Sequence, residues 1–362
     1  MRDRIKNIFD KVEKTIDAII IKNSVHPHID ENFFYITGLD KGIFEQTIAI
    51  LYSDGGADIL VSELEAESAK KTDVHIHVYK NKEDQNNIFK KLTTSFKNIG
   101  INFDGIVYQD FYQLKKILPD SKFIDVSHAF TESRIIKDEC EIENIRKSCK
   151  IADAVMEKIP DILHEGIHEY EVAAEIDYIM QRNGAEKPAF ETISSFASNT
   201  AEPHYTHGDG KLKKGDFALF DFGASFKRYN SDITRTFTFG KAEKRQREMH
   251  KTVFEAQKVG FDLIAPGIIA KEVHNAVNSY IDNTKFKGRF IHSTGHSLGL
   301  AVHDGPGFTP DSNIELKENM VLTVEPGIYL PDFGGVRIED DILIKKKGLE
   351  LLTKSSRELI EI

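Results

Sequence analysis

Two segments of the chain repeat one pattern, and this repeat limits the fold more than any other feature of the sequence. Residues 212–223 read LKKGDFALFDFG and residues 316–327 read LKENMVLTVEPG. Each begins with Leu-Lys, continues through residues that favour β-strands, and ends in an acid, one further residue and glycine. The equivalent acids are Asp221 and Glu325. Two similar halves would bring these acids together about a pseudo-twofold axis, although so short a similarity also arises by chance.

A second acid in an apolar setting follows each repeated segment. Asp232 lies eleven residues after Asp221, and Glu339 lies fourteen residues after Glu325. Burying an unpaired carboxylate among apolar side chains is costly, so such acids are normally paired or bound to a metal. Four gathered carboxylates would repel one another unless divalent cations neutralised them. The acids therefore indicate a metal site.

Three histidines are candidates for the rest of this site. His296 lies in FIHSTGHSLGLAVHD, residues 290–304, whose glycines would let the backbone pass close to a metal or a substrate. His303 follows His296 by seven residues, and His204 precedes the first acid by seventeen. Oxygen ligands with one imidazole suit manganese, cobalt, iron or zinc, and the lack of usable thiols argues against a structural zinc site. Each histidine alone would be an ordinary polar residue, but together with the four acids they favour a metal site.

Two other histidine pairs match metal sites less well. Residues 164–168 read HEGIH and match the H-E-x-x-H signature of zinc peptidases, which needs an uninterrupted helix so that both histidines share one face. Pro160 precedes this segment and Gly166 interrupts it. We therefore predict an inter-helix turn, with a helix beginning near His168. The histidines at residues 26–28 flank a proline in a predicted loop, where a solvated turn is favoured over a metal role.

Changes in character along the chain predict two domains. Residues 1–130 read as an α/β unit in which an aromatic stretch lies at residues 32–38 and no catalytic cluster is found. The elements predicted there are helices at 2–15 and 84–96, strands at 17–21, 74–79 and 105–108, and a hairpin in which strands 47–52 and 58–62 flank the turn 53–56. Residues 131–362 form the second region, with amphipathic helices at 134–159 and 170–181 followed by glycine-punctuated strands.

The composition is that of an ordinary globular protein and disfavours several partners. Hydrophobic residues make up 40% of the chain and charged residues 29%. The 48 basic and 58 acidic residues give a net charge of −10, which disfavours binding to nucleic acid. Cys140 and Cys149 lie in one predicted helix, so no disulfide framework is needed and a cytoplasmic location is expected. No apolar run near the N-terminus is long enough for a signal peptide or a membrane span, so no membrane partner is expected.

The candidate residues resemble the metal set of the superfamily that contains prolidase, aminopeptidase P, methionine aminopeptidase and creatinase. The segment NFFYITG at residues 32–38 is similar to a segment of the family's N-terminal domain, and RIIKDECEIENIR at residues 134–146 resembles its interdomain helix. Four further segments resemble successive active-site blocks, namely SDITRTF, GHSLGLAVH, VEPGIY and GGVRIED. Each block alone is a weak signal. Their order, with eleven residues between the two aspartates, makes the resemblance specific.

The resemblance implies a fold and a ligand set. Residues 1–130 would form a creatinase-like α/β domain, and residues 131–362 an α+β pita-bread catalytic domain. In the family this catalytic domain is a curved, six-stranded antiparallel sheet with pseudo-twofold symmetry, covered by helices. Two divalent metal ions, manganese or cobalt with zinc or iron as alternatives, would be held by Asp221, Asp232, His296, Glu325 and Glu339. Asp232 and Glu339 would bridge the two ions, and the members are commonly homodimers.

The resemblance also implies an activity, the two-metal hydrolysis of the bond before proline in dipeptides or short peptides. Glu325 would take the proton of the attacking water and pass it to the leaving nitrogen. His204 and His303 would steady the tetrahedral intermediate and orient the substrate. Arg337 would hold a substrate carboxylate, with an outward-facing strand arginine as the alternative.

One departure from the family's pattern leaves the substrate length open. Many dipeptidase members carry an arginine at the position of Gly307, where it could clamp a dipeptide's free carboxylate. An Xaa-Pro aminopeptidase acting on longer peptides is therefore an alternative to an Xaa-Pro dipeptidase. The long N-terminal region disfavours a methionine aminopeptidase, and the complete metal set disfavours creatinase. A non-catalytic binding protein on the same fold is a further alternative, although such relatives generally lose metal ligands.

Overall fold

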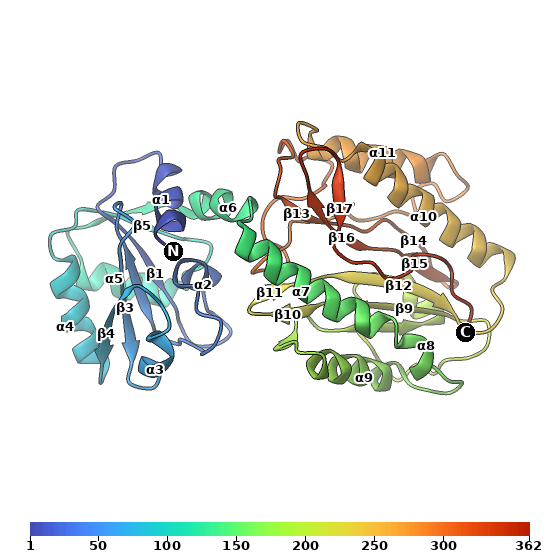
Figure 1. Cartoon of the computed structure of the whole chain (residues 1–362), viewed down its shortest axis with the longest axis horizontal. Helices are drawn as coiled ribbons and strands as arrows, with labels where there is room; N and C mark the ends of the chain where they lie inside the picture. The colour runs from blue at the N-terminus through green and yellow to red at the C-terminus, as the bar shows by residue number, and fades with distance from the viewer. The chain divides into compact units, whose positions relative to one another are not determined.

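The computed structural model describes all residues, 1–362, and the chain divides into two compact units, Met1–Arg134 and Ile135–Ile362 (Figure 1). In each unit, hydrophobic cores lie between helices and strands. No helix is both long enough and apolar enough to cross a membrane.

The N-terminal unit is built on one mixed six-stranded sheet with the order β4-β3-β2-β1-β5-β6. Its strands are β1 (Ala18–Lys22), β2 (Ile48–Leu51), β3 (Ala57–Ser62), β4 (His75–Tyr79), β5 (Asn98–Ile101) and β6 (Lys122–Asp125). Its helices are α1 (Arg2–Asp10), α2 (Glu31–Thr37), α3 (Ala66–Ala69), α4 (Lys82–Thr93) and α5 (Tyr108–Ile117), and α6 (Ser127–Ile135) leads out of it. The first three strands pair antiparallel, whereas β4, β5 and β6 join the sheet in parallel.

The predicted α/β character and hairpin of this unit are confirmed, but one predicted strand is wrong. Residues 105–108 do not form a strand. The strand in this region is β5, a few residues earlier in the chain, which pairs in parallel with β1. Gly105 instead lies in a turn, in which its N–H donates to the carbonyl of Asn102. Tyr108 begins α5. The aromatic stretch forms α2, which ends at Gly38 in the left-handed conformation that glycine adopts at low cost.

The C-terminal unit is α+β, and every pair of its strands is antiparallel. Its helices are α7 (Glu139–Met156), α8 (Ile159–Ile162), α9 (Glu169–Arg182), the 3-10 helix η1 (Ala197–Ala201), α10 (Lys244–Leu263) and α11 (Ala270–Asp282). Its strands are β7 (Lys187–Pro188), β8 (Ile193–Phe196), β9 (Phe217–Phe222), β10 (Ala224–Phe226), β11 (Tyr229–Asn230), β12 (Ile233–Thr238), β13 (Val321–Val324), β14 (Gly327–Leu330), β15 (Gly334–Arg337), β16 (Asp340–Ile344) and β17 (Leu349–Leu351). They form small sheets with the orders β12-β9-β8, β13-β16-β17, β14-β15 and β11-β10-β7.

The C-terminal unit consists of two halves with the same construction. In the first half α7 and α9 pack on β9 and β12, and in the second half α10 and α11 pack against β13, β14 and β15. Leu212 exchanges two backbone hydrogen bonds with the turn at residues 166–167, and Leu316 does the same with the turn at residues 267–268. Both leucines are fully buried. The sequence repeat is therefore a structural repeat, as the predicted pseudo-twofold fold requires.

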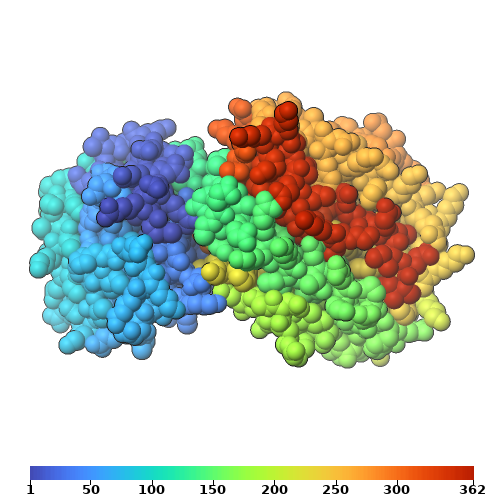
Figure 2. All heavy atoms as spheres, viewed as in Figure 1, coloured from blue at the N-terminus to red at the C-terminus, as the bar shows by residue number.

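The C-terminal segment closes the first half. Glu361 forms an isolated parallel bridge with Thr238 at the end of β12, and the N–H of Gly240 donates to the carbonyl of Ile362. Figure 2 shows this segment, in red, on the surface between the green region of α7 to α9 and the yellow region of α10. The end of the chain thus adds main-chain hydrogen bonds to the edge of the strands that carry the candidate site.

Candidate active site

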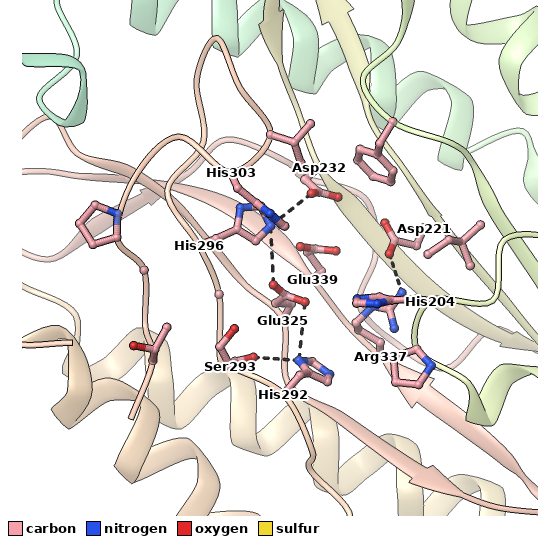
Figure 3. Close-up of a pocket in the computed structure, with 18 of the residues that line it drawn as sticks. His204, Asp221, Asp232, His292, Ser293, His296, His303, Glu325, Arg337 and Glu339 are labelled. Carbon is pink, nitrogen blue, oxygen red and sulfur yellow. Dashed lines mark hydrogen bonds and ion pairs between the residues drawn. The ribbon is translucent and has the colours of Figure 1, made fainter. Parts of the chain in front are cut away.

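Each half of the C-terminal unit delivers two acids to one pocket. Asp221 lies on β9 and Asp232 immediately precedes its partner strand β12, while Glu325 follows β13 and Glu339 immediately precedes β16. Because β9 pairs antiparallel with β12, and β13 with β16, the acids of each half lie at the same end of their strand pair. In Figure 3 the four carboxylates point toward one another. The structure thus brings together all four acids predicted from the sequence.

The acids line a pocket of about 690 Å³, which is large enough for a small molecule or a short peptide. Its ionisable lining includes the predicted histidines and the arginine, namely His204, His296, His303 and Arg337. Its apolar lining is formed by Phe190, Ile193, Pro203, Val302 and Pro306. A mostly apolar lining with a few convergent polar groups is typical of a site that orients a small ligand.

The oxygen atoms in this pocket fit divalent cations. Asp221 Oδ1 and Asp232 Oδ1 are buried and have no hydrogen-bond partner. Ligand atoms of Asp232, His296 and Glu339 all lie within 4.8 Å of one another. His296 Nε2 lies 3.5 Å from Asp232 Oδ2 and 3.7 Å from Glu325 Oε1. Carboxylate oxygens without partners, gathered around one imidazole, are the donor set expected of a divalent metal centre.

The pKa values of the acids are raised because buried carboxylates gathered without a cation are unfavourable in their ionised form. Burial raises the pKa of Asp232 well above its ordinary value, and the nearby charges of Glu339 and Asp221 raise it further. Burial likewise raises the pKa of Glu325 to about 8 and that of Glu339 well above its usual range. A bound divalent cation would reverse this shift, because it favours the ionised carboxylates.

Neighbouring groups fix the two acids that were predicted to bridge the ions. The Thr234 hydroxyl donates to Glu339 Oε2 at 2.6 Å. The N–H of Asp232 donates to Asp341 Oδ2 at 2.8 Å, and the thiol of Cys149 donates to the same oxygen. Cys149 is therefore committed to a buried hydrogen bond beside the site. Such outer contacts hold the ligands in a fixed orientation.

His296 is held by its backbone. Its N–H donates to Thr323 Oγ1 at 3.0 Å, and the N–H of Thr323 donates to the His296 carbonyl at 2.9 Å. A Cβ atom on Gly295 would lie 1.9 Å from the Thr323 carbonyl oxygen, so only glycine fits at this close approach. Burial lowers the pKa of His296 to about 4, and the charge of His303 contributes. The imidazole is therefore neutral near pH 7, as a metal ligand must be.

The two other predicted histidines face the pocket from different segments. The rings of His303 and His296 have centroids 4.3 Å apart, at an interplanar angle of 70°. His204 lies on the loop between η1 and β9 and lines the same pocket as Arg337 (Figure 3). Both side chains belong to exposed residues that line the pocket, so both are accessible to a bound substrate.

A buried acid that the sequence analysis missed organises the loop of His204. Glu169, at the start of α9, is fully buried. Its carboxylate accepts four hydrogen bonds at 2.7 to 3.1 Å, from the N–H groups of Phe196 and Gly208, the amide of Asn199 and the hydroxyl of Tyr205. The available signal was an acid directly after the HEGIH segment, which resembles an ordinary first-turn helix acid.

Arg337 is buried and faces the pocket, so the outward-facing alternative is wrong. Its Nη2 donates to Asp221 Oδ2 at 2.5 Å, its Nη1 to the hydroxyl of Tyr329 at 2.9 Å, and its Nε to Thr234 Oγ1 at 3.1 Å. The guanidinium thus holds a candidate metal ligand. Its contact with a substrate carboxylate stays a prediction.

A further histidine of the pocket was also missed. His292 Nε2 lies 2.8 Å from the Tyr329 hydroxyl, and its Nδ1 lies 3.9 Å from Glu325 Oε2. Burial, with the charge of Arg337, lowers the pKa of His292 to about 3. Its position four residues before His296, in the same segment, was the signal that could have identified it.

The two competing histidine pairs lie outside this pocket. The helix α9 begins at Glu169, after the HEGIH segment, so the predicted inter-helix turn is confirmed. Gly166 adopts a positive φ of 87°, and His168 Nδ1 contacts the carbonyl of Asp209 at 2.8 Å. The histidines at residues 26–28 are exposed and belong to none of the groups with metal-ligand spacing.

Comparisons with known proteins agree over the whole chain. Residues 143–346 match metallopeptidase family M24, and residues 3–136 match the creatinase/prolidase N-terminal domain. The chain is 40% identical to a protein named Xaa-Pro dipeptidase from Pyrococcus horikoshii, over 99% of both chains. It is 37% identical to one of the same name from Pyrococcus furiosus, over 99% of this chain and 100% of the other.

Solved structures show the same two-domain architecture. The prolidase of Pyrococcus horikoshii superposes with a TM-score of 0.91 at 38% identity, covering 99% of this chain and 100% of the other. The X-Pro aminopeptidase of Thermotoga maritima superposes with a TM-score of 0.90 at 30% identity, covering 96% and 98%.

Proposed function

This chain belongs to metallopeptidase family M24, and on that premise we propose that it hydrolyses the Xaa-Pro bond of dipeptides. The observation that carries the proposal is the convergence of four carboxylates and His296 in one pocket of about 690 Å³. The relatives named Xaa-Pro dipeptidase support the substrate class, because they are similar over almost the full length of the chain.

The metal-binding role is proposed for five residues, Asp221, Asp232, His296, Glu325 and Glu339. Their oxygen-rich donor set with one imidazole supports manganese or cobalt, with zinc or iron as alternatives. Asp232 and Glu339, one from each half, are the proposed bridging ligands of two ions. Bound ions would lower the pKa of a water molecule and polarise the substrate carbonyl.

The other polar groups of the pocket manage protons and the substrate. Glu325 would hold the proton removed from the nucleophile and pass it to the proline nitrogen, since its carboxylate faces the pocket beside His296. His303 and His204 would donate hydrogen bonds to the oxyanion that develops on the scissile carbonyl. Arg337 would hold the substrate carboxylate only by sharing its guanidinium with Asp221, whose contact it makes at 2.5 Å.

The apolar residues that line the pocket suit the proline ring. A proline amide offers no N–H for strand-like pairing, so recognition must come from the shape and apolar character of the ring. The apolar side chains that line the pocket are those of Phe190, Ile193, Pro203, Val302 and Pro306. These apolar side chains support a proline-directed enzyme over one that recognises the peptide backbone alone.

One observation favours the alternative, an Xaa-Pro aminopeptidase that accepts longer peptides. A Cβ atom at Gly307 would lie 2.3 Å from the Gly295 carbonyl oxygen and 2.5 Å from His296 Cα. No side chain at position 307 can therefore clamp the free carboxylate of a dipeptide in this backbone. The similarity to an X-Pro aminopeptidase structure also supports this alternative.

The experiment is hydrolysis by protein that has been stripped of metal and reloaded with manganese. The substrates are Ala-Pro, Ala-Pro-Ala and the control Ala-Ala. Cleavage of Ala-Pro alone is expected and would show that a group other than residue 307 binds the carboxylate. Preference for the tripeptide would make the chain an aminopeptidase, and no metal-dependent cleavage of any of them would overturn the proposed function.

We also propose a homodimer and a cytoplasmic location. The family resemblance supports the dimer. The cysteines support a reducing compartment, since Cys140 and Cys149 are both free.

A further inference from the structure

A second group of potential metal ligands lies in the N-terminal unit, where the sequence showed no catalytic cluster. Asp58 lies on β3, and His75 and His77 lie on β4, which is the edge strand of the sheet. Asp58 is the direct partner of His75 in the parallel register of these strands. Since side chains alternate along a strand, residues two apart share a face, and all three side chains project from the same face of the sheet.

The donor atoms of this group converge. Asp58 Oδ1 lies 2.7 Å from His75 Nδ1 and also 2.7 Å from His77 Nε2. The two imidazole rings have centroids 4.5 Å apart, at an interplanar angle of 74°. One ligand atom from each residue lies within 4.8 Å of the others. Two imidazole nitrogens therefore lie at contact distance from one carboxylate oxygen, and the three atoms are close enough together to bind a single ion.

An outer contact orients the carboxylate. The Tyr52 hydroxyl donates to Asp58 Oδ2 at 2.6 Å, which leaves Oδ1 directed at the two histidines. Tyr52 is itself packed edge-on against Phe96, with ring centroids 6.4 Å apart. A hydrogen bond to the second oxygen of a ligating carboxylate is the usual support of a metal ligand in proteins.

The exposure of the group suits an ion that enters from solvent. The side chain of Asp58 is 13% exposed and that of His77 is 23% exposed, whereas that of His75 is 72% exposed. The carboxylate is therefore anchored in the unit, and the outermost imidazole is open to water. Three potential donor atoms that lie within 4.8 Å of one another, on residues partly open to water, can take up an ion from solvent.

We propose that Asp58, His75 and His77 form a metal site of this chain that is distinct from the pocket of the C-terminal unit and takes zinc or a similar borderline divalent cation. Two imidazoles and one carboxylate are the donors that zinc, copper and nickel accept, and three protein ligands leave one coordination position for water. Because the ligands come from adjacent strands, the ion joins β4 to β3 at the edge of the sheet and stabilises the unit that binds it.

The experiment is equilibrium dialysis of the full-length chain against a series of zinc concentrations, with zinc per chain measured by atomic emission. The variant His75→Ala/His77→Ala should bind one zinc fewer than the natural chain. The matched control is His26→Ala/His28→Ala, which removes two exposed histidines with the same spacing and should bind as much zinc as the natural chain. Equal zinc in all three proteins, or an equal loss in both variants, would overturn the proposal.

Two conservative variants keep the test independent of folding defects. Asp58→Asn, which preserves the shape of the side chain, should lose the same equivalent of zinc. Tyr52→Phe keeps all three ligands and should weaken zinc binding at this site by roughly tenfold to a hundredfold, because it removes the outer hydrogen bond. Circular dichroism of each variant reports whether it is folded. Unchanged zinc affinity in both folded variants would also contradict the site.

Discussion

The first half of the C-terminal unit supplies aspartates to the pocket, and the second half supplies glutamates from equivalent places. Asp221 and Glu325 occupy the same position of the repeat. Asp232 precedes β12, the partner strand of β9, and Glu339 precedes β16, the partner strand of β13. The backbone frame is shared, but the second half also contributes His296. The comparison shows that one backbone arrangement delivers candidate ligands from both halves, while side-chain length and type differ between them.

The two halves also differ where a helix begins. The N–H of Glu169 donates to the carbonyl of Gly210 in the first half, and the N–H of Ala270 donates to the carbonyl of Ile314 at the equivalent place in the second. Both residues are fully buried. Glu169 uses its carboxylate to organise the loop of His204, whereas alanine can make no such contact. The side chain at this fold position thus orders a loop of the pocket in one half and only packs in the core in the other.

The largest loss of activity is expected from replacing Asp232 or Glu339, the proposed bridging ligands, one from each half. Asp232→Asn and Glu339→Gln should each lower kcat/KM on the order of a thousandfold or more, because a weakened metal centre loses several kcal/mol of transition-state stabilisation. Both should also lose one or both metals, measured by metal analysis alongside Ala-Pro hydrolysis. Full activity in Asp232→Asn would refute the site assignment, and a large difference between the two variants would break the equivalence of the halves.

A smaller effect is expected at the histidines that line the pocket without being proposed ligands. His303→Ala should lower kcat by roughly a hundredfold, since it removes a group that acts on the reacting atoms. Its metal content should stay nearly intact. Loss of metal in this variant would instead place His303, 4.3 Å from His296 between ring centroids, among the ligands.

A variant at Glu169 tests the difference between the starts of α9 and α11. Glu169→Gln should lower kcat by roughly tenfold, because its carboxylate orients the loop of His204 from outside the pocket. In a His204→Ala background the same change should cost little, since the two residues act through one contact chain. Glu175→Gln, an exposed position of the same helix, is the matched control. Additive effects in the double variant would show that Glu169 only supports folding.

The stability of the metal-free protein should fall as the pH rises from about 6.5 to about 8. Native Glu325, whose pKa is raised from 4.5 to about 8, keeps a proton there that the unfolded chain has released, so rising pH favours unfolding. The lowered pKa values of His292 and His296 act with the opposite sign, but only below their ordinary value of 6.5. Thermal unfolding should show a Tm lower by a few degrees at the higher pH. Reloading manganese should abolish the fall, and a Tm that rises across this window would contradict the raised pKa.

The smallest effect is expected at the HEGIH segment. The double variant His164→Ala/His168→Ala should keep its metal content and its kcat within about twofold, because surface changes away from the site are usually worth less than about 0.5 kcal/mol. Both parameters are measured as for the acids of the pocket. Loss of metal would revive the zinc-peptidase interpretation that the turn at Gly166 argues against.

Most of the candidate site followed from the sequence because its signals are local. The role of an acid such as Asp221 on an apolar strand, or of Gly166 inside the HEGIH segment, can be inferred from the adjacent residues. The repeat added the pairing of the halves, since it identifies which acids are equivalent. Short elements were less predictable. The strand β5 contains a glycine and an asparagine, and only its pairing with β1 and β6 makes it a strand.

Other features were decided by the tertiary structure alone. Whether Arg337 faced solvent or the pocket depended on how β15 packs, and the period of a strand cannot distinguish its two faces by itself. Glu169 reaches a loop about thirty to forty residues away, and Asp58 meets its histidines only through the register of β3 and β4. The sequence determined which residues have the chemistry of a metallopeptidase, because that chemistry resides in side chains. The tertiary structure decided which of them meet, because contacts between distant segments depend on strand register and loop packing.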